Sequence, residues 1–228
     1  MRIEDIEYGF IEIIDNKIIE KIVCNYDGIC TVYFYDRPPQ KMNIGCSSYN
    51  SDYGIPVSED GRILFIGSWE KGLGGNKKGL CAYDIESGSL LWNSPDGKIR
   101  SIFVYSAYVI ALKANGAVFK YNIDNGAKTG EIKSNSIEYM YDLGFPYIYV
   151  DAVKGKQCIV DVEKMLVVKK YSGKAVNPSN CLSVLIQDVV LRDNVLTISG
   201  MEEYPDMDYS KSGGTAFSRV IDTEFNVF

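Results

Sequence analysis

The chain carries one short stretch three times: Ala82-Tyr83-Asp84-Ile85-Glu86-Ser87-Gly88, then Lys120-Tyr121-Asn122-Ile123-Asp124-Asn125-Gly126, and then, in degraded form, Ile159-Val160-Asp161-Val162-Glu163-Lys164. The anchor residues Asp84, Asn122 and Asp161 are 38 and 39 residues apart. A period of about 40 residues indicates that one supersecondary unit is repeated along the chain. The content of a single unit therefore decides the fold.

The unit that covers residues 98–133 is the clearest. Its β-rich segments are separated by short turns: Ile99–Tyr105, Tyr108–Lys113, Ala117–Ile123 and Ala127–Ile132. Two of the turns, Asn115-Gly116 and Asn125-Gly126, are strong hairpin signals because Asn and Gly tolerate the positive φ of tight turns. Four antiparallel strands in about 35 residues make one blade of a β-propeller.

The rest of the chain divides in the same way. The further segments are Phe10–Asp15, Lys17–Val23, Ile29–Tyr35, Lys41–Ile44; Ile55–Val57, Arg62–Gly67, Gly79–Ile85, Ser89–Trp92; Ile137–Leu143, Tyr147–Val153, Gln157–Val162, Leu166–Tyr171; and Leu182–Gln187, Val189–Arg192, Val195–Gly200, Thr215–Thr223. We therefore predict an all-β chain with negligible helix, in which residues 1–228 form a single five-bladed β-propeller domain of four-stranded antiparallel blades. The first or last strand is expected to cross over and close the ring, because closure hides the sheet edges.

One blade resembles a repeat of the quinoprotein-like propellers, which carry PQQ-type repeats. That pattern ends in Ala-x-Asp-x-x-Thr-Gly-x-x-x-Trp, and this chain matches it at Ala82, Asp84, Gly88 and Trp92, with Ser87 in place of Thr. The resemblance implies that the Trp docks on the neighbouring blade. It implies the fold only, since no residues here match a quinone cofactor site, and we expect no cofactor.

Composition excludes several classes of function. The formal charge of −6 and the pI near 4.9 argue against a nucleic-acid partner, which needs a basic footprint. No apolar run is long enough to cross a bilayer, and acidic residues occupy the place of a signal-peptide core near Met1. The six cysteines form no C-x-x-C pair and are read as reduced thiols. We expect a cytoplasmic protein with no membrane association.

The chain contains no histidine. This removes Ser-His-Asp and Cys-His catalysis, histidine-ligated metals and histidine acid–base chemistry. Catalysis would have to use carboxylates, Lys, Tyr or Cys. The absence is unremarkable for a binding protein, and we expect no enzyme activity.

Two long insertions interrupt the strand pattern, at residues 69–78 and 201–214. We expect both to project from one end of the ring, together with the loops that link the blades, where rigid strands hold variable loops. The candidate partner-binding residues on this face are Trp69, Glu202, Glu203, Tyr204, Asp206, Asp208 and Tyr209, with Asp52 and Tyr53 from the first inter-blade loop. The alternative is a solvated hairpin tip whose charges only maintain solubility, with Trp69 plugging a blade end.

Two apparent ligand motifs in these insertions fail on inspection. Asp206-x-Asp208-x-Ser210 begins like a calcium loop, but Lys211 and Phe217 stand where Gly and Glu are required. The glycines of 72–75 lie between strands and lack the strand-to-helix context of a Walker loop. We therefore predict no metal site.

The favoured hypothesis is a non-catalytic, monomeric propeller that binds a basic protein partner through the acidic and aromatic face. An immunity protein that neutralises a toxin is a special case, by analogy of character alone. The alternative is a carbohydrate-binding or glycosidase-like propeller with axial carboxylates, for which Asp52, Asp60 and Asp142 are the candidates. A lectin-like or sensor module is a third reading.

Overall fold

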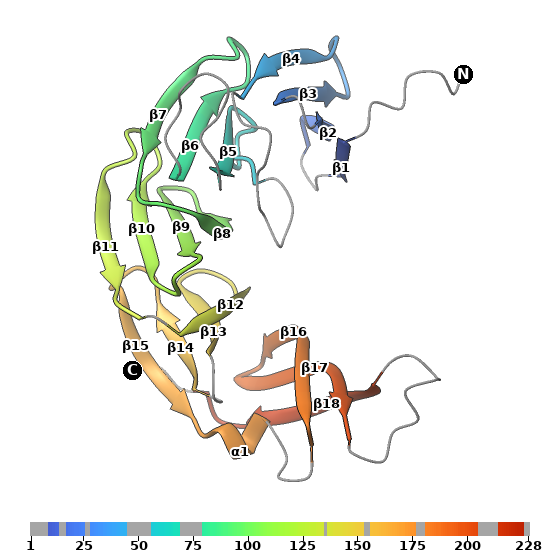
Figure 1. Ribbon diagram of the computed structural model, residues 1–228, viewed down its shortest axis with the longest axis vertical. Helices are drawn as coiled ribbons and strands as arrows, with labels where there is room; N and C mark the ends of the chain where they lie inside the picture. The colour runs from blue at the N-terminus through green and yellow to red at the C-terminus, as the bar shows by residue number, and fades with distance from the viewer. Residues whose placement is uncertain are drawn as a thin grey trace. The chain divides into compact units, whose positions relative to one another are not determined.

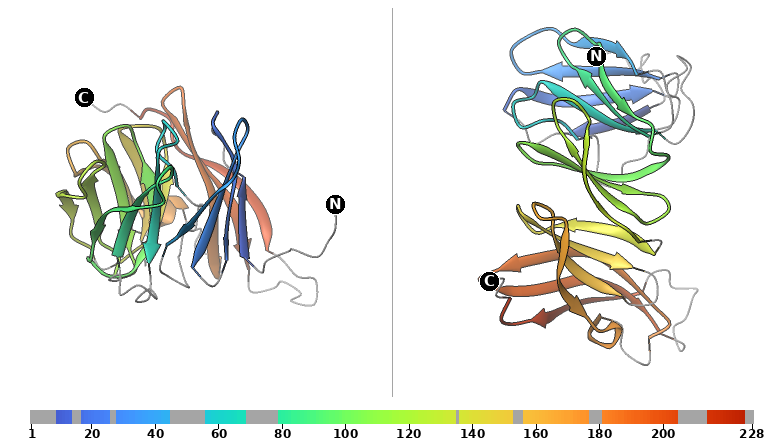
Figure 2. Two further views of the ribbon diagram at one scale, coloured as in Figure 1. Left: turned by 90° about the horizontal axis from the view of Figure 1, so that it is seen from above. Right: turned by 90° about the vertical axis from the view of Figure 1, so that its left-hand side faces the viewer.

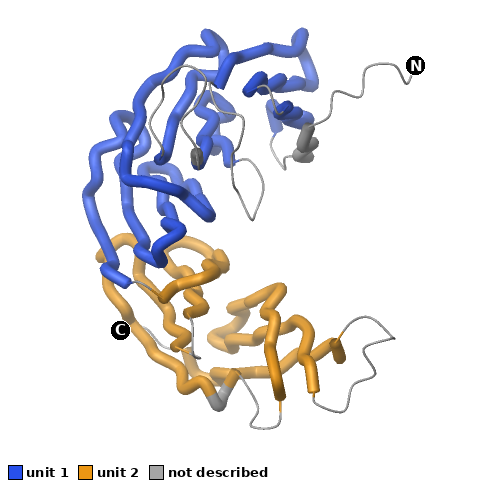
Figure 3. Tube along the Cα trace, in the orientation of Figure 1, with its two compact units in different colours: residues 1–135 blue, residues 136–228 orange. Residues whose placement is uncertain are grey.

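In the computed structural model, the regular elements of the described residues are β-strands, apart from one short helix (Figure 1). It describes residues 9–13, 17–25, 28–44, 56–68, 79–134, 136–152, 156–176, 181–204 and 214–225. The chain forms two compact units, Met1–Asn135 and Ser136–Phe228, which Figure 3 shows in separate colours. Each unit is described by itself below.

Unit 1 contains three antiparallel sheets. Their orders are β1-β2-β3-β4, β5-β6-β7 and β11-β10-β9-β8. The strands are β1 (Gly9–Ile13), β2 (Ile19–Asn25), β3 (Ile29–Phe34), β4 (Gln40–Asn43), β5 (Ile63–Ser68), β6 (Gly79–Asp84), β7 (Leu90–Ser94), β8 (Ile99–Val104), β9 (Tyr108–Lys113), β10 (Val118–Asn122) and β11 (Lys128–Ile132).

Unit 2 contains two antiparallel sheets, with the orders β12-β13-β14-β15 and β16-β17-β18. The elements are β12 (Ile137–Asp142), β13 (Tyr147–Ala152), β14 (Gln157–Asp161), β15 (Leu166–Tyr171), α1 (Gly173–Val176), β16 (Ser183–Arg192), β17 (Val195–Glu203) and β18 (Thr215–Asp222). The four-residue α1 is the only helix among the described residues, as the lack of a helical period predicts. Figure 2 shows the twist of the strands within each sheet.

The predicted strands coincide with the observed ones to within a few residues, with two exceptions. The segments Leu182–Gln187 and Val189–Arg192 were predicted as two strands, but they form the single strand β16. A register shift between Ile186 and Asp188 absorbs one residue, so the strand continues through the polar pair at 187–188. Of the predicted strand Ile55–Val57, residues 56 and 57 are described, and Val57 forms a single antiparallel bridge with Leu64. Three sheets therefore have four strands and two have three among the described residues.

The repeated stretch is a turn that its own side chains hold closed. The anchor residue of each copy accepts a hydrogen bond from the backbone amide three residues later: Asp84 from Ser87 at 2.7 Å, Asn122 from Asn125 at 3.2 Å and Asp161 from Lys164 at 2.9 Å. Asp and Asn are the residues that form such turns. The anchor spacing is therefore the spacing at which the last strand but one of a sheet ends, since the anchors end β6, β10 and β14.

The residue after each capped amide has a left-handed backbone. Gly88 and Gly126 have φ of 68° and 67°, and Met165 holds the same position with φ of 53°. Glycine adopts this conformation without steric cost, whereas a side chain on the residue costs free energy. The third copy thus keeps the backbone of the turn although Met165 stands in place of glycine.

Trp92 joins two sheets of unit 1. Its indole Nε1 donates a hydrogen bond of 2.9 Å to the carbonyl of Ile123, which lies within the second copy of the turn. A Cβ on Gly126 would lie 2.4 Å from the Trp92 ring, so only glycine fits below the indole. Met42 lies against Gly88 in the preceding pair of sheets. The docking Trp implied by the quinoprotein-like resemblance is present.

Within unit 1 the cores lie between successive sheets, and β5 contributes to two of them. Leu64 and Ile66 join a core with residues of β2, β3 and β6, whereas Ile63 and Phe65 join a core with residues of β6, β9 and β10. This alternation follows from the two-residue period of a strand that is covered on both faces. In unit 2 the described core lies between the two sheets and includes Tyr149, Ile159, Ile186 and Ile198.

Candidate functional site

The acidic insertion begins within a strand. Glu202 and Glu203 are the last residues of β17, and Glu202 pairs with Thr215 of β18 across the sheet. Tyr204 follows directly. The other predicted binding residues lie outside the described residues: Asp52, Tyr53, Trp69, Asp206, Asp208 and Tyr209.

Glu202 lies in the interior and its charge is compensated. The residue is only 4% exposed, and its carboxylate forms an ion pair with the guanidinium of Arg219 on β18. The guanidinium also donates a 2.6 Å hydrogen bond to the carbonyl of Val176 in α1. A buried carboxylate needs such a partner because removing it from water is costly. Glu202 therefore contributes little net charge to the surface and joins β17, β18 and α1.

Tyr204 is held by the second oxygen of the same carboxylate. Its hydroxyl donates a 2.6 Å hydrogen bond to Glu202 Oε2. This bond to a carboxylate raises the pKa of the Tyr204 phenol. A charge-assisted hydrogen bond of this length fixes the orientation of the ring, so the aromatic residue at the base of the insertion is held in place by the fold.

Glu203 points to the solvent side of the strand. Its carboxylate accepts a 2.7 Å hydrogen bond from Ser183 Oγ, at the first residue of β16, and the side chain is exposed. The backbone amide of Leu182 donates a 2.7 Å hydrogen bond to the carbonyl of Glu203. Adjacent strand residues point to opposite faces, which separates the buried Glu202 from the exposed Glu203. The described site is thus an exposed carboxylate beside a fixed tyrosine.

The carboxylates proposed for a glycosidase-like site do different work in the described structure. Asp60 accepts a 2.6 Å hydrogen bond from Ser58 Oγ, and this bond lowers the pKa of the Asp60 carboxyl. A general acid for glycoside cleavage needs a raised pKa. Asp142 Oδ1 accepts a 2.9 Å hydrogen bond from the backbone amide of Gly144 within a turn. Asp52 lies outside the described residues.

Asp151 is a residue that our reading of the sequence missed. It lies on β13, and burial raises the pKa of its carboxyl, with a smaller contribution in the same direction from Glu138. Gln157 Nε2 donates a 2.9 Å hydrogen bond to Asp151 Oδ1. The signal was present in the sequence, because Asp151 continues the alternation of Tyr147 and Tyr149 on a buried strand.

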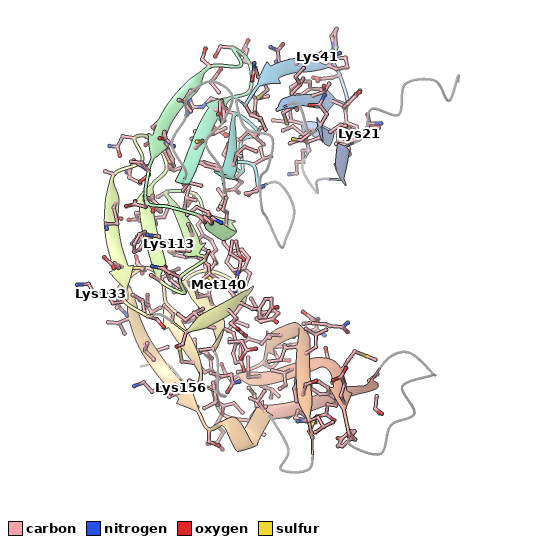
Figure 4. All side chains as sticks on the ribbon, in the orientation of Figure 1. Lys21, Lys41, Lys113, Lys133, Met140 and Lys156 are labelled. Carbon is pink, nitrogen blue, oxygen red and sulfur yellow. The ribbon has the colours of Figure 1, made fainter. Side chains whose placement is uncertain are left out.

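A second missed feature is a shallow hollow of about 410 Å³ on unit 1, beside the β9–β10 turn. Lys113 and Lys133, both labelled in Figure 4, line it together with Asn115, Phe119 and Glu131. Lys113 Nζ lies 4.7 Å from the centre of the Phe119 ring, an attractive cation–π arrangement. Lys113 is therefore engaged with the protein's own surface.

Metal and membrane sites were also sought. Within the described ranges, the Cys, Asp and Glu side chains form no group of three that could hold a metal ion. In the same part of the chain, no helix is long and apolar enough to cross a bilayer.

Comparison with known proteins supports the architecture. No family model matches the sequence, and no curated protein matches it. Among solved structures, the chain is similar to the crystal structure of BamB from Moraxella catarrhalis, with 14% identity and a TM-score of 0.60. The match covers 96% of this chain and 62% of that one, so this chain spans less than two thirds of the BamB length. BamB is a β-propeller of the PQQ-like and WD40 type. The chain described here shares that propeller fold.

Proposed function

We propose that the chain is a non-catalytic β-propeller that binds a protein partner through the face bearing its two insertions. In this proposal its five sheets are the blades of one closed ring, and the protein is a cytoplasmic monomer. The observation that carries the proposal is the exposed Glu203 carboxylate beside the fixed Tyr204 ring. Fixed aromatic side chains beside acidic groups suit partner recognition, because the aromatic residue anchors and the charge directs the encounter.

The charge of the partner follows from that of the chain. The formal net charge is −6, and three further residues of the insertion, Asp206, Asp208 and Tyr209, repeat the acidic and aromatic character of Glu203 and Tyr204. The partner proposed here is accordingly basic, and an inhibitor that caps the basic active site of a toxin is the narrowest form of the proposal. Cys24, Cys30 and Cys81 form no disulfide among the described residues, which suits a reducing compartment.

The geometry of Glu202 changes how this proposal has to be tested. Reversing its charge would place a lysine against Arg219 in the interior and unfold the strand pair. The informative variant therefore reverses Glu203, Asp206 and Asp208 to Lys and keeps Glu202. A matched control reverses three carboxylates of unit 1, Glu20, Glu86 and Asp124, which are exposed. Both variants change the net charge equally.

The experiment is affinity capture from native lysate, followed by titration calorimetry with the purified partner. The expected result is one stoichiometric partner, recovered by the wild type and by the control variant and lost by the insertion variant. Binding should weaken as salt rises, since the charges are exposed. Equal recovery by both variants would show that the face is wrong, and equal loss would show that only the net charge matters.

A further inference from the structure

Two cysteines of unit 1 lie directly opposite each other on neighbouring strands. Cys24 of β2 pairs with Cys30 of β3 in the antiparallel register. Both side chains are 0% exposed and belong to the same core. Residues that lie opposite each other in a sheet point to the same face, so the two thiols are neighbours within this core. A further cysteine of the core, Cys81 on β6, lies opposite Ile66 and Asn93 instead.

The backbone hydrogen bonds show which kind of antiparallel pair the two cysteines form. The Gly28 carbonyl accepts a 2.8 Å hydrogen bond from the amide of Ile44, so it points to the β4 side of β3. The backbone groups of successive strand residues point to opposite sides, and Cys30, two residues after Gly28, therefore also turns its backbone towards β4. Cys24 and Cys30 are thus a non-hydrogen-bonded pair. In such a pair the Cα atoms are closest, about 4.5 Å apart.

The turn that joins the two strands holds this register. The Asn25 side chain accepts a 2.9 Å hydrogen bond from the Ile29 amide, and the Asn25 carbonyl accepts one of 3.2 Å from the Gly28 amide. Gly28 has φ of 78°, which glycine adopts without steric cost. Asn25 and Ile29 are the chain neighbours of the two cysteines. Their hydrogen bond therefore keeps Cys24 opposite Cys30.

This arrangement fits a disulfide bond. Disulfide-bonded cysteines have Cα atoms about 4.4–6.8 Å apart and Cβ atoms about 3.5–4.5 Å apart. Opposite residues of an antiparallel pair have Cβ atoms about 4.5–5.5 Å apart, and the non-hydrogen-bonded kind has the shorter distances. The Cα atoms are therefore already in range, and the Cβ atoms need to approach by about 1 Å at most. A change of rotamer and a small movement of the two strands complete the geometry.

We infer that Cys24 and Cys30 are a redox-responsive pair, which a peroxide converts into a cross-strand disulfide that fastens the β2–β3 hairpin below its turn. In a reducing compartment the pair rests as two thiols. Both sulfurs are buried, so the peroxide reaches them when the end of the hairpin opens locally. This inference goes beyond the proposed function and does not depend on the identity of the partner.

The reaction balances with hydrogen peroxide as the oxidant. One thiolate sulfur attacks a peroxide oxygen, the O–O bond breaks, and the sulfur becomes a sulfenic acid while the released hydroxide takes up a proton. The other sulfur then attacks the sulfenic sulfur, so the S–S bond forms, the S–O bond breaks, and the thiol proton leaves with the oxygen as water. The two thiols lose two electrons in all, and the peroxide is reduced to two water molecules.

The test uses the full-length protein, treated with hydrogen peroxide and then alkylated to block the remaining thiols. Cleavage after Lys21 and Lys41 releases residues 22–41, which contain these two cysteines and no other. Mass spectrometry should show that this peptide carries no alkyl group and has lost two hydrogen atoms. A further cut before Asp27 should leave the cysteines on two fragments that only the disulfide joins. Dithiothreitol should separate the fragments and restore both thiols.

Cysteine variants show whether this disulfide changes the fold. Cys24→Ala and Cys30→Ala should each abolish the linked fragments. Cys81→Ala is the matched control, because Cys81 is 2% exposed in the same core and no cysteine lies opposite it. In urea titrations the oxidised wild type and the oxidised control should unfold at a higher urea concentration than their reduced forms, because the disulfide restricts the unfolded chain. The Cys24→Ala and Cys30→Ala variants should show no such shift.

Three results of the peptide mapping would overturn the inference. They are alkylation of both cysteines after peroxide treatment, a disulfide from either one to another cysteine, and accumulation of a sulfinic acid on either one without an S–S bond. A urea shift that persists in Cys24→Ala would also refute it, because another group would then cause the stabilisation. The mapping uses the wild-type chain, so it decides the question even where an alanine variant fails to fold.

Discussion

Gly126→Ala is expected to be far more damaging than an alanine at a surface turn normally is. Gly126 has φ of 67°, and its missing Cβ would lie 2.4 Å from Trp92 Cε3 and 2.6 Å from Cδ2. The indole cannot yield freely, because its Nε1 donates a hydrogen bond to the carbonyl of Ile123 and its ring packs in the second core of unit 1.

The magnitude can be assembled from three contributions. The left-handed backbone costs about 1 kcal/mol once a Cβ is present. Displacing a packed ring costs about 1–3 kcal/mol, and losing the Trp92–Ile123 hydrogen bond costs about 1 kcal/mol. We therefore expect Gly126→Ala to lower the free energy of unfolding by about 3–5 kcal/mol. Gly88→Ala is the control, because its φ is 68° and its nearest contact, Met42 Cβ, lies at 3.3 Å; it should cost about 1–2 kcal/mol.

Urea unfolding followed by far-UV circular dichroism measures both values. A double-mutant cycle with Trp92→Ala isolates the contact, because without the indole Gly126→Ala should cost only the backbone contribution of about 1 kcal/mol. The reasoning is refuted if Gly126→Ala costs no more than Gly88→Ala, or if its cost is unchanged in the Trp92→Ala background.

Three further predictions concern single residues. Met165→Gly should raise the free energy of unfolding by about 0.5–1 kcal/mol in urea titrations, because it relieves a left-handed backbone at φ 53°; destabilisation would contradict the turn equivalence. Asp151→Asn should stabilise the fold increasingly as pH rises above 3.8, the ordinary aspartate pKa, because the folded state holds the Asp151 proton to higher pH than the unfolded state does and the wild type loses stability on deprotonation. Thermal melts from below pH 3.8 upward measure this, and a gain that does not grow as the pH rises from 3.8 would count against it. Glu202→Ala should cost about 3–5 kcal/mol because Arg219 loses its partner, whereas Glu203→Ala should cost less than about 0.5 kcal/mol; similar losses would show that Glu202 is not buried as described.

Local sequence signals predicted the strands well. The bounds Tyr108–Lys113 and Leu166–Tyr171 agree with β9 and β15, because hairpin residues and apolar alternation mark both ends of each strand. The prediction of two strands between Leu182 and Arg192 was wrong, because a bulge shifts the register within the single strand β16. A bulge breaks the two-residue period without ending the strand, so periodicity alone read it as a boundary.

The candidate site was harder to predict, because burial depends on residues far along the chain. Glu202 pairs with Arg219, which is 17 residues away, and Arg219 reaches Val176, which is 43 residues away. The two-residue alternation along β17 indicates that Glu202 is buried, because Leu196, Ile198 and Gly200 lie on the same face of the strand and are all buried. A carboxylate in phase with a core stripe is expected to have a partner.

The tyrosine hydroxyls between sheets have a spectroscopic consequence. Tyr83 donates to the Ile44 carbonyl at 2.6 Å, and Tyr141 donates to the Ile186 carbonyl at 2.8 Å. Tyr121 bonds Asp96 at 2.9 Å, and burial raises the pKa of this phenol far above its ordinary value of 10. Burial likewise raises the pKa of the Tyr149 phenol. Ultraviolet absorbance in mild alkali should therefore detect phenolate only from the exposed members of the 17 tyrosines. The buried tyrosines should ionise only when the sheets that enclose them separate.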